Sequence, residues 1–302
     1  MSEVENTRCG FVALIGAPNA GKSTLLNALV GAKVSIVSRK VQTTRAQVRG
    51  IALHGAAQII FVDTPGIFRP KRRLDRAMVV SAWGGVDEAD VVCLLIDARK
   101  GLDEEASQIL ERLKGVRQRK CLALNKIDTL EVEKLLELAQ KVNAILPFEE
   151  TFMISALRGH GVETMKAKLA DMMKPGPWLY PEDQISDAPL RQLAAEITRE
   201  KIFERLHDEL PYQITVETDQ WKNLPDGSAR IEQTIFVTRE GHRKIVLGEG
   251  GSTIKSIGAA ASKDIAEASE QKTHLFLFVK VRENWIDDPE RYREIGLEFP
   301  KE

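Results

Sequence analysis

The octapeptide GAPNAGKS, at residues 16–23, constrains the fold more than any other feature of the sequence. It matches the pattern G-x-x-x-x-G-K-[ST] and stands between an apolar run at 11–16 and a helical pattern, the context that a phosphate-binding loop requires. In such a loop, backbone N–H groups and the helix N-terminus hold phosphate oxygens. An ordinary strand–helix turn is the alternative, and the flanking strand and helix make it the weaker interpretation.

Two side chains of this loop have predicted chemical roles. Lys22 can reach the β and γ phosphates of a nucleotide, and Ser23 can ligate Mg²⁺ through its hydroxyl. We expect the whole loop to contact the nucleotide. The residues concerned are Gly16, Ala17, Pro18, Asn19, Ala20, Gly21, Lys22, Ser23 and Thr24.

Short apolar runs alternate with amphipathic helical patterns through the first half of the chain. The runs lie at 11–16, 58–63, 91–97, 120–126 and 151–155. Alternation of this kind predicts a doubly wound, mostly parallel α/β sheet, which we assign to residues 1–175. Each run is followed by a turn carrying Gly, Asp, Asn or Ser, at the carboxyl ends of the strands, where open α/β sheets bind ligands.

The stretch NKID, Asn125 to Asp128, follows a later strand and predicts guanine as the base. A carboxylate only accepts hydrogen bonds, so Asp128 suits the N1–H and 2-amino donors of guanine and repels the N1 acceptor of adenine. Lys126 can lie over the base, and Asn125 can tie loops together. After the next strand, the sequence Ser155, Ala156, Leu157 can offer a backbone N–H to the guanine O6.

A third motif, DTPG, ends the apolar run at 58–63 and comprises Asp63, Thr64, Pro65 and Gly66. Asp63 can hold Mg²⁺ through water, and the Gly66 N–H can meet the γ-phosphate. Either Thr43 or Thr44, in the preceding polar stretch, should complete the magnesium shell. We favour Thr44; a simple turn is the alternative interpretation of the threonine pair.

The stretch 174–189 contains four prolines and no periodicity, and we interpret 176–189 as a linker. Beyond it, at 190–302, the patterns change to the order α-β-β-α-α-β, which predicts a separate small α+β domain. A C-terminal tail with Trp285, Tyr292 and Phe299 follows the last predicted strand. These aromatic residues could contact RNA, the first domain or their own domain.

Between two predicted helices of the second half lies the glycine-rich loop GEGG, Gly248 to Gly251. It is no second nucleotide loop, because Thr253 stands where the second glycine should be. Glycines without Cβ let a backbone approach a nucleotide chain closely, and the helix N-terminus attracts phosphate. The predicted RNA-binding residues are Arg243, Lys244, Gly248, Glu249, Gly250, Gly251, Ser252 and Lys255.

These motifs, in this order, resemble the Era-like GTPase family, in which a Ras-like G domain precedes a type II KH domain. The resemblance spans nearly the whole chain. It implies hydrolysis of GTP with Mg²⁺, binding near the 3′ end of small-subunit ribosomal RNA, and a role in assembling the small ribosomal subunit. It also implies a monomeric bacterial protein of the cytoplasm, with peripheral association at the inner membrane as an addition that no basic amphipathic helix supports.

Catalysis is predicted to rest on Lys22, Thr44, Gly66 and Asn19. Many Ras-like GTPases place a glutamine after DTPG to orient water, but Ile67 stands here and cannot hydrogen-bond water. In related GTPases with GxPNxGKS, the asparagine that matches Asn19 helps to bind K⁺ beside the phosphates. A turn-capping role for Asn19 is the alternative, and Arg45 is another candidate charge.

Composition limits the remaining classes of function. The 302 residues carry a formal net charge of −1, so any RNA site must be a local basic patch. One such patch, FRPKRRLDR at 68–76, is either a solvated loop or a contact that depends on nucleotide state. Two other classes stay open: a second domain that binds protein or membrane, and an RNA-modifying enzyme, which would need a reactive cysteine or a cofactor site.

The termini and apolar runs predict no secretory signal and no membrane span, since the start MSEVENTRCG is polar and no apolar run reaches 18 residues. The cysteines Cys9, Cys93 and Cys121 show no CxxC spacing, and the latter two lie in apolar runs. We interpret them as buried thiols of a reducing compartment.

Overall fold

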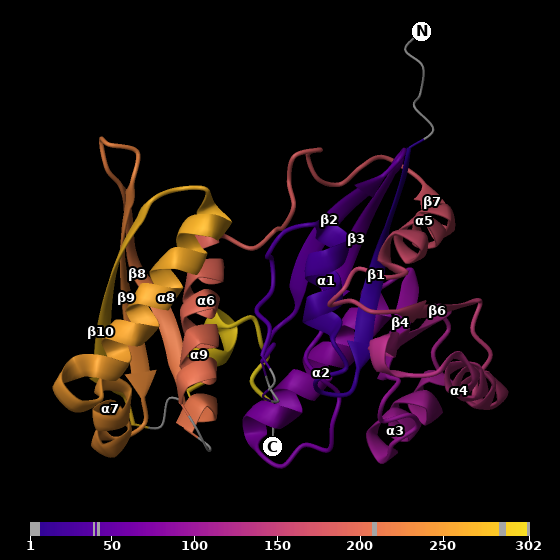
Figure 1. Cartoon of the computed structure of the whole chain (residues 1–302), viewed down its shortest axis with the longest axis horizontal. Helices are drawn as coiled ribbons and strands as arrows, with labels where there is room; N and C mark the ends of the chain where they lie inside the picture. The colour runs from indigo at the N-terminus through magenta and orange to yellow at the C-terminus, as the bar shows by residue number, and fades with distance from the viewer. Residues whose placement is uncertain (1–6, 39, 41–42, 207–209, 284–287, 301–302) are drawn as a thin grey trace, which may run out of the picture. The chain divides into compact units, whose positions relative to one another are not determined.

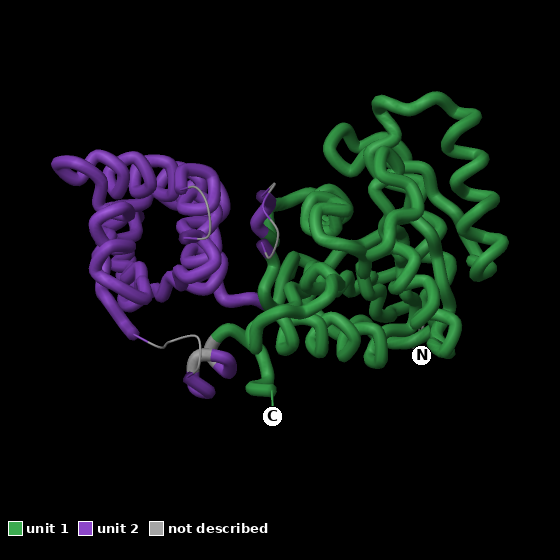
Figure 2. The backbone as a smooth tube through the Cα atoms, turned by 90° about the horizontal axis from the view of Figure 1, so that it is seen from below, with its two compact units in different colours: residues 1–35, 44–187, 295–302 green, residues 36–43, 188–294 purple. Residues whose placement is uncertain are grey.

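The structure is a computed structural model, and it describes residues 7–38, 40, 43–206, 210–283 and 288–300. The chain divides into two compact units (Figure 2), which we treat separately. Unit 1 comprises residues 1–35, 44–187 and 295–302, and unit 2 comprises residues 36–43 and 188–294.

Unit 1 is built on a twisted sheet with the strand order β2-β3-β1-β4-β5-β6 (Figure 1). The five predicted apolar runs are confirmed as its parallel strands: β1 (Arg8–Gly16), β3 (Ala57–Asp63), β4 (Val91–Asp97), β5 (Arg119–Asn125) and β6 (Glu150–Ile154). The edge strand β2 (Val48–His54) runs antiparallel to β3, and the two-residue β7 (Lys174–Pro175) pairs antiparallel with β1. Neither of these two was predicted from sequence.

Helices cover both faces of this sheet. They are α1 (Lys22–Val30), α2 (Arg73–Glu88), α3 (Glu104–Leu113), α4 (Val132–Ile145) and α5 (Val162–Met172), with a short helix η1 (Ile127–Thr129). Along β1, Val12 and Leu14 join one apolar cluster while Ala13 and Ile15 join the other. Alternating side chains of a single strand thus enter two cores, which is why the strand reads as a continuous apolar run.

Residues 176–187, interpreted above as linker, are hydrogen-bonded along unit 1. The Gln58 side chain on β3 accepts the N–H groups of Leu179 and Tyr180 at 2.9 and 3.0 Å and donates to the Tyr180 carbonyl at 2.8 Å. The Ile51 N–H donates to the Ile185 carbonyl at 2.9 Å. The change from one unit to the other therefore falls at residues 187–188.

Unit 2 has the predicted order α-β-β-α-α-β. Its elements are α6 (Leu190–Arg205), η2 (Leu210–Gln213), β8 (Thr215–Asn223), β9 (Ala229–Val237), α7 (Glu240–Leu247), η3 (Glu249–Gly251), α8 (Ser252–Ser269), β10 (Thr273–Val281) and α9 (Pro289–Glu294). The sheet order is β10-β9-β8, with β8 antiparallel and β10 parallel to β9. Helices α6 and α8 cover one face of this sheet (Figure 1).

Two short segments belong to the unit that sequence order would not suggest. Residues 36–43 belong to unit 2, and residues 295–302 belong to unit 1. In the tail, Phe299 lies 5.0 Å below the guanidinium of Arg73 on α2, and Tyr292 of unit 2 is 1% exposed. Trp285 lies outside the described residues. The predicted domains are contiguous stretches of sequence, so their boundaries do not separate these two segments from the rest of the chain.

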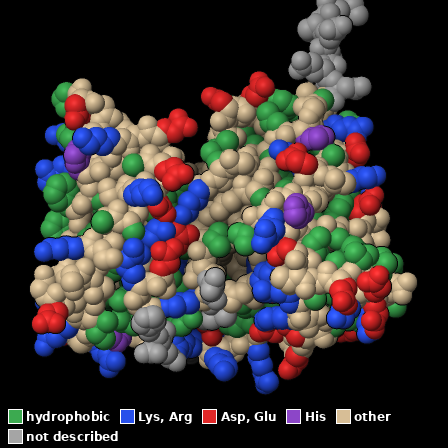
Figure 3. Space-filling model, in the orientation of Figure 1, with side chains coloured by type: hydrophobic (Ala, Val, Ile, Leu, Met, Phe, Trp, Pro, Cys, Tyr) green, Lys and Arg blue, Asp and Glu red, His purple; other side chains and the backbone are tan. Residues whose placement is uncertain are grey.

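The basic patch at 68–76 is partly the start of a helix. Asp75, in the first turn of α2, accepts the N–H groups of Lys71 and Arg72 at 3.0 and 2.9 Å. On the face drawn in Figure 3, Lys and Arg side chains are interspersed with Asp and Glu, as the net charge near zero implies. No helix in the described part of the chain combines the length and the apolar character that a transmembrane span requires.

Candidate active site and nucleic-acid interface

The phosphate-binding loop connects β1 to α1 and needs a left-handed backbone. Gly21, which precedes α1, has φ 102°, and a Cβ there would lie 2.2 Å from the Asn125 side-chain nitrogen. Asn19 also has a positive φ of 63°, a conformation that asparagine tolerates. Ala17, Pro18 and Ala20 complete the loop, and Thr24 lies in the first turn of α1. The loop thus has the path that the sequence predicts.

Lys22 is buried and folded onto its own loop. It is 6% exposed, and its Nζ lies 3.2 Å from the carbonyl oxygens of both Gly16 and Ala17. Burial lowers the pKa of Lys22 to about 8, although the nearby Asp63 carboxylate acts in the opposite direction. An ammonium held with so little solvent is stabilised by an arriving phosphate.

This low pKa predicts proton uptake when a nucleotide binds. At pH 8 Lys22 is about half protonated without ligand, and phosphate raises its pKa, so binding should take up about half a proton. Nucleotide affinity should accordingly weaken as the pH rises above about 8. Calorimetry in buffers of different ionisation enthalpy measures the uptake, and Lys22→Met should abolish it. Uptake that persists in Lys22→Met would assign the proton to another group.

Asp63, at the end of β3, is the centre of a buried polar cluster. Its Oδ2 accepts hydrogen bonds from the hydroxyls of Ser23 (2.6 Å), Ser35 (3.0 Å) and Thr44 (3.3 Å), and the Ser23 and Thr44 hydroxyls lie 2.9 Å apart. Burial raises the pKa of Asp63, against the pull of Lys22 and the hydroxyls. Its Oδ1 is buried and has no hydrogen-bond partner within the described residues.

These groups fit a magnesium ion. Hydroxyl and carboxylate oxygens are hard ligands of the kind that Mg²⁺ takes beside nucleotide phosphates. A buried carboxylate oxygen without a partner is costly unless something binds it. Of the two candidate threonines, Thr44 lies at Asp63, whereas the Thr43 hydroxyl donates to the Lys40 carbonyl at 2.8 Å. Ser35 was not predicted, because no motif marks it in the sequence.

The remaining residues of DTPG lie against β1 and the phosphate loop. The Thr64 hydroxyl donates to the Leu14 carbonyl at 2.8 Å, Pro65 is buried, and Gly66 is half-buried. The Ile67 N–H donates to the Gly16 carbonyl at 3.1 Å. The Ile67 side chain is 8% exposed and packs in an apolar cluster with Ala82 and Trp83. It therefore supplies nothing that could orient an attacking water.

Asn125 ties three loops together, as predicted. Its side-chain nitrogen donates to the Ala20 carbonyl at 2.8 Å, and its oxygen accepts the N–H groups of Lys126 (2.8 Å) and Ala156 (3.0 Å). Lys126, at φ 68°, extends its Nζ to the Asn19 carbonyl and to Asp97 Oδ2 at 2.9 Å. Asn125 thereby fixes the turns that contain Lys126 and Ala156 against the phosphate loop.

Asp128 lies on η1 with its carboxylate exposed. A side-chain hydrogen bond with Ser155 lowers the pKa of Asp128, so the group is ionised and purely an acceptor at neutral pH. The N–H of Ser155 bonds the His160 carbonyl at 3.0 Å, and that of Ala156 is used by Asn125. Leu157, the third residue of this turn, is 83% exposed.

Asp97, at the end of β4, is a functional candidate that the sequence did not single out. It pairs with Arg99 at 2.7 Å and with Lys126 at 2.9 Å. These two cations outweigh burial, which alone would raise the pKa of Asp97, and they lower it to about 2. A permanently ionised Asp97 thus holds Lys126 where the base is expected. An acidic residue in a strand-end turn is too common a pattern to reveal this role.

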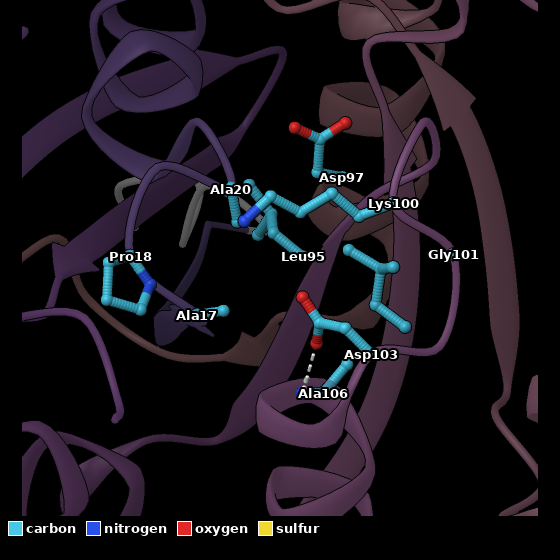
Figure 4. Close-up of a pocket in the computed structure, with 10 residues that line it drawn as sticks. Ala17, Pro18, Ala20, Leu95, Asp97, Lys100, Gly101, Asp103 and Ala106 are labelled. Atoms are coloured by element: carbon cyan, nitrogen blue, oxygen red, sulfur yellow. Dashed lines mark hydrogen bonds between the residues drawn. The ribbon is translucent and has the colours of Figure 1, made fainter. Parts of the chain in front are cut away.

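A small pocket opens beside the phosphate loop (Figure 4). Ala17, Pro18 and Ala20 line one side, and the turn between β4 and α3 lines the other with Asp97, Lys100, Gly101 and Asp103. Asp103 accepts the Ala106 N–H at 2.8 Å and caps α3. The nitrogen of Lys100 lies beside Ala20 in this view. The pocket adjoins the predicted nucleotide site, because the phosphate loop lines it while Ser23, Asp63 and Asp128 do not.

The second glycine-rich loop lies between two helices, as predicted. It follows α7, and α8 begins at Ser252 directly after it. Gly248 has φ 72°, and a Cβ there would lie 2.3 Å from the Thr253 hydroxyl, so only glycine fits. Gly250 and Gly251 have φ of 57° and 79°; a Cβ at Gly250 would have open space, and one at Gly251 would lie 3.9 Å from Cε of Lys255. We call residues 248–251 the clamp loop.

Charged and apolar side chains surround the clamp loop. Lys244, Glu249, Ser252 and Lys255 are exposed, and Arg243 is exposed while pairing with Glu240 at 2.9 Å. Of the apolar residues nearby, Val246 and Ile257 are fully buried in the core, whereas Ile245 is 53% exposed. Backbone N–H groups, a helix N-terminus and flexible lysines suit a phosphodiester backbone.

Fold and site together place the chain among P-loop GTPases that carry a KH unit. A family described as "50S ribosome-binding GTPase" matches residues 11–126, and a KH domain family matches residues 209–286. GTPase Era of Afipia carboxidovorans is 68% identical over 296 residues, covering 98% of this chain and 96% of that protein. GTPase Era of Brucella suis is 64% identical over 299 residues, covering 99% and 96%. The chain belongs to the Era family of GTPases.

Two solved structures of Era share the whole fold. One is Era in complex with MgGDPNP and nucleotides 1506–1542 of 16S ribosomal RNA, with a TM-score of 0.91 and 37% identity over 96% of this chain and 99% of that chain. The other is an Era variant from Aquifex aeolicus bound to GDP and aluminium fluoride, with the same TM-score, identity and coverage. Both domains and their order are therefore those of an Era GTPase.

Proposed function

We propose that this protein is a GTP-hydrolysing switch that binds the 3′ end of 16S ribosomal RNA and assists assembly of the small ribosomal subunit. The observation that carries the proposal is the pairing, in one chain, of the Asp63 cluster with the clamp loop. An Era structure that is 37% identical holds MgGDPNP and 16S RNA together, which supports both ligands. A monomeric state and a cytoplasmic location are part of the proposal.

Each residue has a defined task in hydrolysis. Ser23, Thr44 and Asp63 are the residues that would hold Mg²⁺, which would neutralise phosphate charge when bound. Lys22 stabilises the charge that develops on the transferred phosphoryl group, and the Gly66 N–H contacts its oxygens. Asp128 selects guanine while Asn125 and Lys126 position it. Because Ile67 is packed in the core, unaided hydrolysis should be slow.

K⁺ is the proposed source of the missing positive charge, held by Asn19 beside the phosphates. Hydrolysis should then be about tenfold or more faster in KCl than in NaCl at equal ionic strength. Asn19→Ala should remove this difference while leaving GTP binding within about threefold. Phosphate release measured at saturating GTP gives both rates. Equal rates in the two salts, with Asn19→Ala also unchanged, would leave Asn19 with the turn-forming role that its φ supports.

RNA binding by the clamp loop has a matched pair of test variants. Gly251→Asp places a carboxylate where phosphate should lie and should weaken binding of a 16S 3′-end oligonucleotide about 10²-fold. Gly227→Asp is the control, since Gly227 lies in the β8–β9 turn with a similar φ of 82°, and a Cβ there would meet nothing within 4 Å. Wild-type affinity should fall steeply with salt. Equal losses in the two variants, or none, would locate the RNA elsewhere or assign unit 2 a protein or membrane partner.

The burial of two cysteines argues against a thiol-dependent RNA-modifying activity at these positions. Cys93 and Cys121 are both fully buried, and burial raises the pKa of Cys121 to about 12. A thiol with so high a pKa is not a nucleophile at neutral pH.

A further inference from the structure

Helix α6 carries three consecutive charged residues whose side chains are buried. Arg199, Glu200 and Lys201 are 1%, 3% and 8% exposed. Charged side chains are rarely buried, because removing them from water costs several kcal/mol each unless partners compensate. Three in a row on one helix therefore indicate a specific arrangement of partners. Arg199 pairs with Glu196 on α6 itself, its Nε donating to Glu196 Oε1 at 2.9 Å, and the other partners lie in two different places.

The first place is the segment 36–43, which belongs to the same compact unit as α6. The Val37 N–H donates to Glu200 Oε1 at 2.7 Å, and the guanidinium of Arg199 donates to the Thr43 carbonyl. Ile36 is 2% exposed in an apolar cluster with Ala194 and Ile197 of α6. The backbone of this segment is thus held at both ends by α6.

The residue that follows this segment is Thr44. Its hydroxyl lies 2.9 Å from Ser23 and 3.3 Å from Asp63, in the cluster that fits magnesium. The chain therefore passes, within one peptide bond, from a carbonyl bound by Arg199 to a predicted ligand of the nucleotide's metal. A movement of Thr44 on loss of the γ-phosphate would act directly on the Thr43 carbonyl that Arg199 holds, in the segment whose other end Glu200 holds at Val37.

The second place is α8, the helix that begins directly after the clamp loop. Lys201 Nζ lies 2.7 Å from Asp264 on α8, 3.3 Å from Glu200 and 3.1 Å from Glu204. Although burial lowers the pKa of Lys201, the bond to Asp264 and the two glutamates raise it above its usual value. Lys201 is thus a permanent cation that joins Glu200 to Asp264 on α8.

A second bond joins α6 to α8 near the clamp loop. Arg205 Nε donates to the Ser256 hydroxyl at 2.9 Å, in the first turns of α8. In addition, Arg199 retains one buried guanidinium nitrogen, Nη1, that has no hydrogen-bond partner in the described part of the chain. A buried donor without a partner is a cost that a second arrangement of segment 36–43 could relieve.

We propose that Arg199 and Glu200 are positioning residues that couple the state of Thr44 to the clamp loop, through Lys201 and Asp264. This rests on the proposed function, because it names how the GTP state is communicated to the RNA site. Coupling of this kind is reciprocal: if GTP changes RNA affinity by some factor, RNA changes GTP affinity by the same factor.

The test measures RNA affinity in two nucleotide states of the full chain. The probe is an RNA of nucleotides 1506–1542 of 16S ribosomal RNA, the segment bound by the related Era. The ratio of its Kd with GDP to its Kd with GDPNP should differ from 1 by about fivefold or more in the wild type. In Glu200→Met, which removes the acceptor of the Val37 N–H, the ratio should fall to within about twofold of 1.

Glu204→Met is the matched control. Glu204 lies on the same helix and also pairs with Lys201, yet it has no bond to segment 36–43 among the described contacts. It should keep the wild-type ratio.

Arg199→Met is a second test variant. Because it frees the Thr43 carbonyl, its ratio of RNA Kd values with GDP and with GDPNP should also fall to within about twofold of 1. Thermal unfolding and GDP affinity establish that each variant is folded with an intact nucleotide site.

The outcomes separate the two proposals. A wild-type ratio of 1 with tight RNA binding contradicts the proposed switch itself. A wild-type ratio that survives in folded Glu200→Met and Arg199→Met contradicts only the role of these residues, as does an equal loss in Glu204→Met. The coupling is supported if the nucleotide dependence of RNA affinity disappears only in Glu200→Met and Arg199→Met. GDP affinity and the RNA affinity of the GDP state should be preserved in both variants.

Discussion

Asp128→Asn should exchange guanine for xanthine as the base that this GTPase binds. The exposed, ionised Asp128 can only accept hydrogen bonds, and guanine offers two adjacent donors. A carboxamide has one acceptor and one donor, which match N1–H and the C2 carbonyl of xanthine. GTP affinity should fall about 10³-fold or more, because a donor then faces the 2-amino group, while XTP should bind. Competition binding with both nucleotides measures the exchange.

XTP binding by the same variant is the internal control, because it shows that the protein is folded and the phosphate loop intact. Wild-type GTP affinity in Asp128→Asn would mean that Asp128 does not contact the base. Loss of both nucleotides would attribute the effect to the turn that Asp128 shares with Ser155. Either result would contradict the assignment of guanine selectivity to this side chain.

Asp63→Asn should affect stability and activity in opposite directions. Because burial raises the pKa of Asp63 in the folded state, ionisation of this carboxyl group opposes folding, and the cost diminishes as the pH falls. The neutral carboxamide removes the cost, so the nucleotide-free variant should unfold at an equal or higher temperature. Hydrolysis should slow about 10³-fold, since the group meant to hold Mg²⁺ is lost.

Titration of Mg²⁺ separates these effects. Mg²⁺ should strengthen GTP binding in the wild type and should have little effect in Asp63→Asn. Ser35→Ala removes a hydrogen bond to the same oxygen but leaves the carboxylate, and it should keep most of the magnesium dependence. Undiminished hydrolysis by Asp63→Asn, or a large loss of stability, would contradict the role assigned to the unpaired Oδ1.

The sequence predicted those parts of the molecule that local patterns determine. Buried parallel strands are continuous apolar runs, so β1, β3, β4, β5 and β6 could be located, and each nucleotide motif lay at the end of one. The clamp loop was equally recognisable, because Gly248 and Gly251 stand between two helical patterns in the sequence. Fold class and the nucleotide motifs therefore followed from short-range patterns.

The parts that were missed depend on contacts between distant residues. Ser35 reaches Asp63 across 28 positions, and Asp97 holds Lys126 across 29, with no motif to mark either. The edge strand β2 is as long as β3, but it mixes polar and apolar residues, with Gly50 at its third position. The buried charges of α6 resemble a solvated helix face in the sequence, because their partners, such as Thr43 and Asp264, are 156 and 63 positions away.

The RNA bound in living cells decides whether this protein acts on the small ribosomal subunit. Crosslinking in living cells, followed by sequencing of the bound RNA, should recover the 3′-terminal region of 16S ribosomal RNA from the wild type. Recovery should be lost in Gly251→Asp and retained in Gly227→Asp. Recovery of 23S ribosomal RNA, of tRNA or of no RNA would contradict the proposal that this GTPase acts on the small ribosomal subunit.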